Sequence, residues 1–207
     1  MKKYIALFAL LFTVAFAFAS QSFASDTYSD LDKAPWAEEE ILYLTSENII
    51  DGYPDGRFGP NDPLTRNQAV KMLVYDLYPN VEPTSNPGFP DVSTSNFYYE
   101  MIAVGFEKGL INGYPDGTFR GKDQITRAEA AHMLDNAYDI SRGLNNGSFP
   151  DVRGLWAEES ITDLASKNYI NGYPDGTFKP GEPISRAEFS KMLAGILDNS
   201  VRVISIK

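Results

Sequence analysis

The sequence predicts a mainly α-helical protein built from three helix-loop-helix repeats that share one core. A Gly-Tyr-Pro-Asp-Gly turn occurs three times, beginning at Gly52, Gly113 and Gly172, with spacings of 61 and 59 residues. Each turn is followed by a Thr-Arg or Ser-Arg pair that opens an amphipathic helical pattern. Such a regular period indicates an internal repeat. A single two-helix unit of this size cannot bury its own apolar face, so the repeats should pack on one another.

Residues 1–24 are predicted to be a secretory signal peptide. Lys2 and Lys3 precede an uncharged apolar run over residues 4–19, and small residues up to Ala24 offer a cleavage site. The run is shorter than the roughly 20 residues that a membrane-spanning helix needs. The remaining chain divides into three repeats and a short tail whose alternating pattern is typical of a strand: 28–80, 89–141, 149–199 and 200–207.

Each repeat opens with an acidic residue and an aromatic residue, followed by a first helix. In the third repeat, Trp156, Ile161 and Leu164 share one face of this helix. The pattern ends at Asn or Gly, which accept the left-handed conformation that terminates helices. The opening pairs are Asp30 with Trp36, Asp91 with Phe97 and Asp151 with Trp156, and the predicted helix ends are Asn48, Gly109 and Asn168.

The second helix of each repeat has a clear start signal. Thr or Ser at the N-cap is followed three residues later by Gln or Glu, which completes a capping box. An arginine occupies the first helical position between them. The capping pairs are Thr65 with Gln68, Thr126 with Glu129 and Ser185 with Glu188, and the arginines are Arg66, Arg127 and Arg186.

Composition argues against several functions. The formal net charge of −10 disfavours nucleic acid, because binding to nucleic acid is dominated by neutralisation of phosphates. The chain has no cysteine and one histidine, His132, and no Ser-His or paired-carboxylate arrangement recurs. The Asp-Gly turns lack the alternating ligands and the final glutamate of a calcium loop. We therefore expect no catalytic residues, no cofactor and no metal site.

The three arginines are candidates for anion binding. A cation at the first helical position opposes the helix dipole by roughly 0.3–1 kcal/mol, yet every repeat has one. A guanidinium beside helix N-terminal N–H groups can bind a carboxylate or a phosphate. A structural ion pair with the turn aspartates is the alternative, and the residues alone leave both interpretations open. Those aspartates are Asp55, Asp116 and Asp175.

The opening residues also have two interpretations. Trp36, Trp156 and Phe97 could stack on sugar rings or cover the core, and for Phe97 we favour the core. The aspartates could contact a ligand or cap the first helix, and capping is the favoured interpretation. The three aspartates are Asp30, Asp91 and Asp151.

The turn Gly-Tyr-Pro-Asp-Gly-Thr-Phe, the helix start Thr-Arg-Ala-Glu and the acidic-aromatic opening resemble the S-layer homology domain family over about residues 28–199. The repeats alone are compatible with a row or a closed ring, and the resemblance implies a pseudo-threefold arrangement around a central three-helix bundle. It also implies non-covalent anchoring to the cell wall. Family members bind secondary cell-wall polysaccharide, often with pyruvate ketals, in grooves between repeats, and the arginine of the helix start contacts this ligand.

This sequence departs from the family pattern in repeat 1, where Asn67-Gln68 replaces Ala-Glu and Asp51 replaces an asparagine. Phe97 replaces the tryptophan of repeat 2. Three equal pockets are therefore not expected, and we rank Arg127 and Arg186 above Arg66 as ligand contacts.

These observations predict a secreted, non-catalytic module of the cell surface that binds an acidic wall polysaccharide, with no nucleic-acid partner and no membrane insertion after signal-peptide removal. A protein-interaction scaffold with degenerate polysaccharide binding is the alternative, and the missing catalytic set disfavours a wall hydrolase. The predicted polysaccharide-binding residues are Arg66, Arg127, Arg186, Trp36, Trp156, Asp30, Asp91 and Asp151.

Overall fold

A computed structural model describes residues 28–140 and 148–205, so the predicted signal peptide lies outside the described residues. Within these ranges the protein is mainly helical and has no strand, which confirms the predicted fold class. Two short 3₁₀ helices, η1 (Leu31–Lys33) and η2 (Pro35–Ala37), precede the first α-helix. The α-helices are α1 (Glu38–Ser46), α2 (Arg66–Leu77), α3 (Tyr99–Glu107), α4 (Arg127–Tyr138), α5 (Glu158–Ser166) and α6 (Arg186–Ser205).

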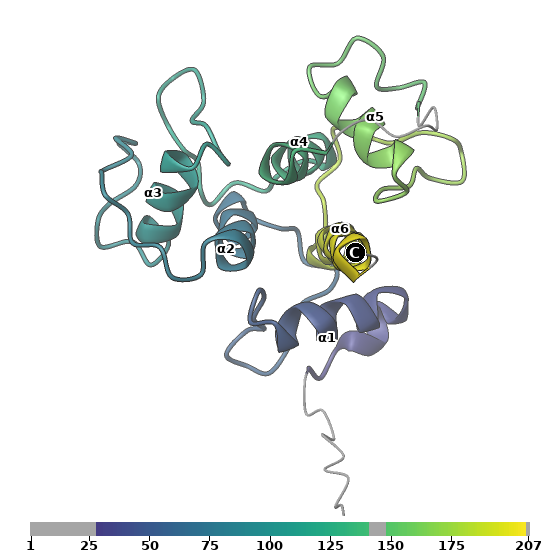
Figure 1. Cartoon of the computed structure of the whole chain (residues 1–207), viewed down its shortest axis with the longest axis horizontal. Helices are drawn as coiled ribbons and strands as arrows, with labels where there is room; N and C mark the ends of the chain where they lie inside the picture. The colour runs from purple at the N-terminus through teal and green to yellow at the C-terminus, as the bar shows by residue number, and fades with distance from the viewer. Residues whose placement is uncertain (1–27, 141–147, 206–207) are drawn as a thin grey trace, which may run out of the picture.

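The helices form an inner and an outer set. Helices α2, α4 and α6 stand together in the middle of the molecule, and α1, α3 and α5 lie around them (Figure 1). Each outer helix packs on the inner helix of the preceding repeat: α3 on α2, α5 on α4, and α1 on α6. One continuous apolar core runs through all three repeats. The repeats therefore share their core in cyclic order, whereas the pseudo-threefold arrangement implied by the family resemblance stays a prediction.

The loops that lead into the inner helices close the ring. The N–H of Leu64 donates to the carbonyl of Ile184 at 2.9 Å, Ile184 N–H donates to Ile125 at 3.1 Å, and Ile125 N–H donates to Leu64 at 3.0 Å. These three side chains are completely buried or nearly so. The three aliphatic residues before the N-caps thus join all the repeats at one point.

Local sequence signals account for where the helices begin and end. The N-caps Thr65, Thr126 and Ser185 exchange both hydrogen bonds of a capping box with the residue three positions later. The first helices end where Asn48, Gly109 and Asn168 adopt positive φ angles of 59°, 72° and 62°. A short polar side chain or glycine tolerates this left-handed conformation.

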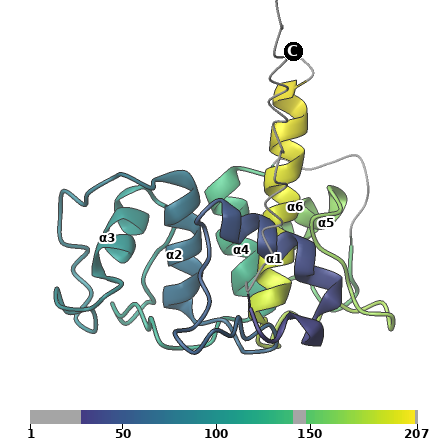
Figure 2. The same ribbon diagram turned by 90° about the horizontal axis from the view of Figure 1, so that it is seen from below.

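The tail differs from the expectation. The alternating pattern over residues 200–207 predicts a short strand, but α6 continues to Ser205, so this prediction is wrong. Figure 2 shows α6 extending beyond the other helices. No helix within the described part of the chain is both long enough and apolar enough to span a membrane.

Candidate functional site

The recurrent turn packs tightly against the opening residues of its own repeat. In repeat 2 the N–H of Gly117 donates to the carbonyl of Tyr114 at 2.8 Å, which closes the Tyr-Pro-Asp-Gly turn. A Cβ atom on Gly113 would lie 2.5 Å from the Phe89 ring. Only glycine lets the chain pass this close, so the backbone before the turn is held in place.

The turn aspartates form ion pairs within their own turns. Asp55 pairs with Arg57 at 2.9 Å, and Asp116 pairs with Arg120 at 2.6 Å. Asp175 lies 3.8 Å from Lys179. The alternative interpretation, in which these aspartates pair with the arginines of the helix starts, is therefore wrong.

The helix-start arginines instead reach into the next repeat. Arg186 is only 3% exposed, and it donates from Nε to the Phe58 carbonyl at 2.9 Å and from Nη2 to the Asp51 carbonyl at 2.7 Å. Arg127 makes the matching bonds to Phe178 at 2.8 Å and to Asn171 at 3.3 Å. These long side chains tie consecutive repeats together through backbone carbonyls.

Arg66 follows the same path less completely. Its Nη2 donates to the Asn112 carbonyl at 2.6 Å, but its Nε is buried without a hydrogen-bond partner. All three guanidinium groups lie over aromatic rings of the neighbouring repeat, at 4.5–5.0 Å from the ring centroids, which adds a cation–π attraction. The rings are Tyr114 and Phe119 for Arg66, Tyr173 and Phe178 for Arg127, and Tyr53 and Phe58 for Arg186.

The N-termini of the inner helices are closed to anions. In α6 the N–H of Arg186 donates to the Asp62 carbonyl at 2.9 Å, and that of Ala187 donates to the Pro60 carbonyl at 3.0 Å. Helices α2 and α4 make the same pair of bonds with the loop of the next repeat. The expectation that a ligand uses helix N-terminal N–H groups is therefore wrong. Only the guanidinium edge left free by the carbonyls can meet an anion.

The opening aspartates hold the loop that follows the turn. Both oxygens of Asp30 accept backbone hydrogen bonds, from Phe58 N–H at 2.7 Å and from Gly59 N–H at 3.1 Å. Asp91 and Asp151 accept the equivalent pairs in repeats 2 and 3. The expectation that they cap the first helix is wrong, because the loop N–H groups occupy these carboxylates.

These bonds make folding stability depend on pH. Burial opposes ionisation of Asp91 and Asp151, but the loop N–H groups outweigh it and the pKa of both carboxyls is lowered. A carboxyl whose pKa is lowered by folding stabilises the fold at pH values above its unfolded pKa of about 3.9. This stabilisation is lost as the pH falls through the pKa of the folded state. Burial raises the pKa of Asp76 and Asp135, so these two groups oppose folding at neutral pH.

We therefore expect urea unfolding midpoints to hold or rise slightly from pH 7 to pH 5 and to fall steeply below about pH 4. The double variant Asp91→Asn/Asp151→Asn should lose part of the acid-side slope, because an asparagine does not titrate. An unchanged slope in that variant would contradict the role given to these carboxylates.

Three grooves with the same construction lie between the repeats. Each is lined by the segment that leads into the turn of one repeat, by the inner helix of that repeat, by the exposed aromatic residue of the following repeat and by the arginine of the preceding one. We number them by the turn, and their volumes are about 310, 500 and 370 Å³. Groove 1 combines Tyr53 with Phe97 and Arg186, groove 2 combines Tyr114 with Trp156 and Arg66, and groove 3 combines Trp36 with Arg127 and Tyr169.

The aromatic residues are available to a ligand. Trp36, Trp156 and Phe97 are 48%, 63% and 68% exposed. The expectation that Phe97 covers the core is therefore wrong. An exposed aromatic face beside a polar groove suits stacking against the apolar face of a sugar ring.

One further position belongs to the grooves: the residue three after the capping Gln or Glu, which is Lys71, His132 or Lys191. His132 is half-buried, with Nδ1 3.1 Å from the Ser160 hydroxyl and its ring edge-on to Trp156. The sequence offered one signal for this position: it lies three residues after the capping residue, so both side chains lie on the same helix face.

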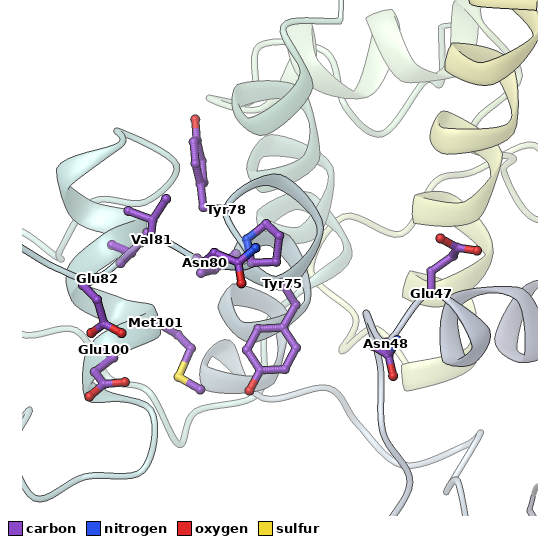
Figure 3. Close-up of a pocket in the computed structure, with 12 residues that line it drawn as sticks. Glu47, Asn48, Tyr75, Tyr78, Asn80, Val81, Glu82, Glu100 and Met101 are labelled. Atoms are coloured by element: carbon purple, nitrogen blue, oxygen red, sulfur yellow. The ribbon is translucent and has the colours of Figure 1, made fainter.

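A separate cavity of about 590 Å³ lies outside the grooves, between the end of α2, the following loop and α3. Figure 3 shows Tyr75 and Met101 beside each other, Glu82 and Glu100 to one side and Glu47 to the other. Three glutamates and no lysine or arginine line it, among the residues that the structure describes. Its negative charge makes it unsuited to an acidic polymer.

The family model of the S-layer homology domain matches residues 27–70, 88–131 and 148–190. The chain is 36% identical over 152 residues to cell surface glycoprotein 1 of Acetivibrio thermocellus, and 37% identical over 149 residues to the cellulosome-anchoring protein of the same organism. It is 30% identical over 175 residues to an S-layer protein of Bacillus licheniformis. These matches cover 67%, 68% and 83% of this chain but only 7%, 33% and 20% of the relatives.

Proposed function

The chain belongs to the S-layer homology domain family, and from this premise we propose that it is a secreted, non-catalytic module that attaches to the cell wall. Its ligand is an acidic secondary cell-wall polysaccharide, carrying pyruvate ketals, which it binds in the grooves between repeats. Support comes from relatives named for cellulosome anchoring and for the S-layer, which match two thirds or more of this chain.

The observation that carries the proposal is the recurrence of one groove design in three places. Each groove joins an exposed aromatic ring to a buried arginine, and each takes these groups from different repeats. Local packing alone does not require a large exposed aromatic residue at the same place in every repeat, because exposed apolar surface is unfavourable. A sugar chain would use it, since a pyranose ring stacks on an aromatic face while its hydroxyls bond to polar groups around it.

Each residue type has its own role in this proposal. Trp36, Trp156 and Phe97 stack on sugar rings. The arginines contact the ligand from the guanidinium edge that the backbone carbonyls leave free, and charge-assisted bonds of this kind are strong. At Arg127 this edge is paired with Glu188, which a ligand would have to displace. The aspartates Asp30, Asp91 and Asp151 support the loop next to the groove through its N–H groups and act on the ligand only indirectly.

Co-sedimentation with cell-wall sacculi tests the proposal, before and after the secondary polysaccharide is stripped. The variant Trp36→Ala/Trp156→Ala should bind sacculi at least about tenfold more weakly, since an aromatic residue at the centre of an interface contributes about 2 kcal/mol. Both side chains are exposed, so the fold should survive their loss. Phe106→Ala is the matched control, because Phe106 is 40% exposed and lines none of the three grooves.

Binding that disappears both on stripping and in the tryptophan variant would support the grooves as the polysaccharide site. Binding that survives both the stripping and the tryptophan substitutions would contradict the proposal and favour the protein-interaction scaffold. Turnover of purified wall by the wild-type protein would contradict the non-catalytic part of the proposal.

A further inference from the structure

The three grooves differ in charge although they share one design. The capping residue that faces each groove is Gln68 in groove 1, Glu129 in groove 2 and Glu188 in groove 3. Groove 1 is lined by two cations and one carboxylate, groove 2 by one of each, and groove 3 by two of each. Groove 1 alone among the three therefore has an excess of positive charge with His132 neutral.

In groove 3 the protein supplies its own anion to the arginine. Glu188 Oε1 lies 3.1 Å from Nη1 of Arg127, while Oε2 accepts the capping hydrogen bond from Ser185 N–H at 2.8 Å. This side of Arg127 is the one that the carbonyls of Phe178 and Asn171 leave free. An entering carboxylate would have to displace Glu188 from the arginine and would meet a like charge, which costs free energy.

Groove 2 is also neutralised, through a different contact. Glu129 accepts a hydrogen bond from the Tyr114 hydroxyl at 2.7 Å and one from Thr126 N–H at 2.8 Å. Its carboxylate lines the same groove as Arg66. The lysine of the other grooves is replaced by His132, whose Nε2 lies 3.1 Å from Nδ2 of Asn136.

In groove 1 the corresponding place is uncharged. The side-chain carbonyl of Gln68 accepts from Thr65 N–H at 2.9 Å, which preserves the cap without a carboxylate. Arg186 has no carboxylate within ion-pair distance among the described residues, and burial lowers its pKa. Lys71 adds a second cation, paired with the exposed carboxylate of Asp51. A buried cation without an internal counter-ion gains most from an external anion.

We propose that groove 1 binds the negatively charged group of the polysaccharide and that grooves 2 and 3 bind its neutral sugar rings, with the residue at the capping position as the determinant. This inference rests on the proposed function, because it assigns parts of the same ligand to the three grooves. The least typical repeat supplies the groove best suited to an anion, and the charge comes from Arg186 of repeat 3, one of the two arginines ranked above Arg66.

The test exchanges the two capping residues. Gln68→Glu places a carboxylate beside Arg186, and Glu188→Gln removes the one beside Arg127. Both residue types complete a capping box, so neither change should alter the fold, and melting temperatures check this. The probe is the acidic polysaccharide released from sacculi and cut to short fragments, titrated by calorimetry alongside the same fragments after reduction of their carboxylates to alcohols.

The wild type should bind the acidic fragment at one site per chain and the reduced fragment at least about tenfold more weakly, since reduction removes the negative charge that pairs with Arg186 and close charge pairs at an interface contribute to affinity. Gln68→Glu should bring the affinity for the acidic fragment down to that for the reduced one. Glu188→Gln should add a second site for the acidic fragment.

Unchanged binding in Gln68→Glu, or no added site in Glu188→Gln, would overturn the assignment of groove 1. The proposed function would still hold in that case, provided that the wild type binds sacculi. Failure of the wild type to bind intact sacculi would overturn the proposed function, and the assignment with it. Equal binding of the acidic and reduced fragments would likewise overturn the assignment.

Discussion

Replacing Arg186 with alanine is expected to lower the free energy of unfolding by about 3 kcal/mol. The guanidinium is 3% exposed and satisfies the carbonyls of Phe58 and Asp51, which belong to the first repeat. Its loss leaves a buried carbonyl without a donor, which costs about 1–3 kcal/mol, and removes the stacking on Tyr53. The substitution also cuts one of the ties that close repeat 3 onto repeat 1. Urea unfolding followed by circular dichroism measures the change.

Arg120→Ala is the control for this prediction. Arg120 is exposed, and its side chain contacts groups of its own turn, namely Asp116, Thr118 and the ring of Tyr114. Exposed ion pairs contribute little to stability, so its unfolding midpoint should stay near that of the wild type. Equal effects of the two substitutions would show that Arg186 has no structural role between repeats.

An alanine series at Arg66, Arg127 and Arg186 would reduce wall binding through loss of the fold as well as through loss of ligand contacts. Arg186→Lys keeps the positive charge but loses the planar set of donors that serves two carbonyls. Exchanges of the neighbouring capping residue change groove charge while leaving the arginine in place, and they separate the two effects.

Replacing Asp30 with alanine is expected to cost about 2–3 kcal/mol of unfolding free energy. Asp30 is 4% exposed, and its carboxylate is the acceptor for two consecutive backbone N–H groups, those of Phe58 and Gly59. Without it, these donors are left in a largely water-free place. The carbonyl of Phe58 accepts from Arg186, so one peptide unit is held on one side by Asp30 and on the other by a different repeat.

Asp32→Ala gives the comparison for this second prediction. Asp32 is exposed and lies two residues along in η1, so its removal should leave the thermal midpoint unchanged within error. A double-mutant cycle of Asp30→Ala with Arg186→Ala should show coupling, because both side chains bind the same peptide unit. Strictly additive effects would contradict the interpretation that Asp30 and Arg186 stabilise the same peptide unit.

Short-range signals predicted the helix starts and ends well. Thr65 and Gln68 stand three residues apart, which is the distance over which a capping box acts, and both bonds form. Asn48 stands directly after the first helical pattern and adopts the left-handed conformation. These features depend only on residues within about one helical turn, and those residues can be read directly from the sequence.

The environment of the site residues could not be predicted in the same way. Phe97 was expected in the core, yet it is exposed at a groove whose other lining residues come mainly from repeats 1 and 3, which a pattern within repeat 2 does not reveal. Asp30 was expected to cap a helix, yet its partners lie 28 and 29 residues further along the chain. An aspartate cap and an aspartate loop anchor look alike in sequence, since both satisfy backbone N–H groups.

The sequence by itself determined the number of repeats, the helical class, the positions of the caps and the presence of an arginine at each inner helix. Only the tertiary structure decided that the arginine of one repeat serves the groove of the next, so that Arg186 and Gln68 line the same groove. Capping bonds act between residues three or four apart. The partners of Arg186 at Asp51 and Phe58 lie 135 and 128 residues away, and only cyclic packing of the repeats brings them together.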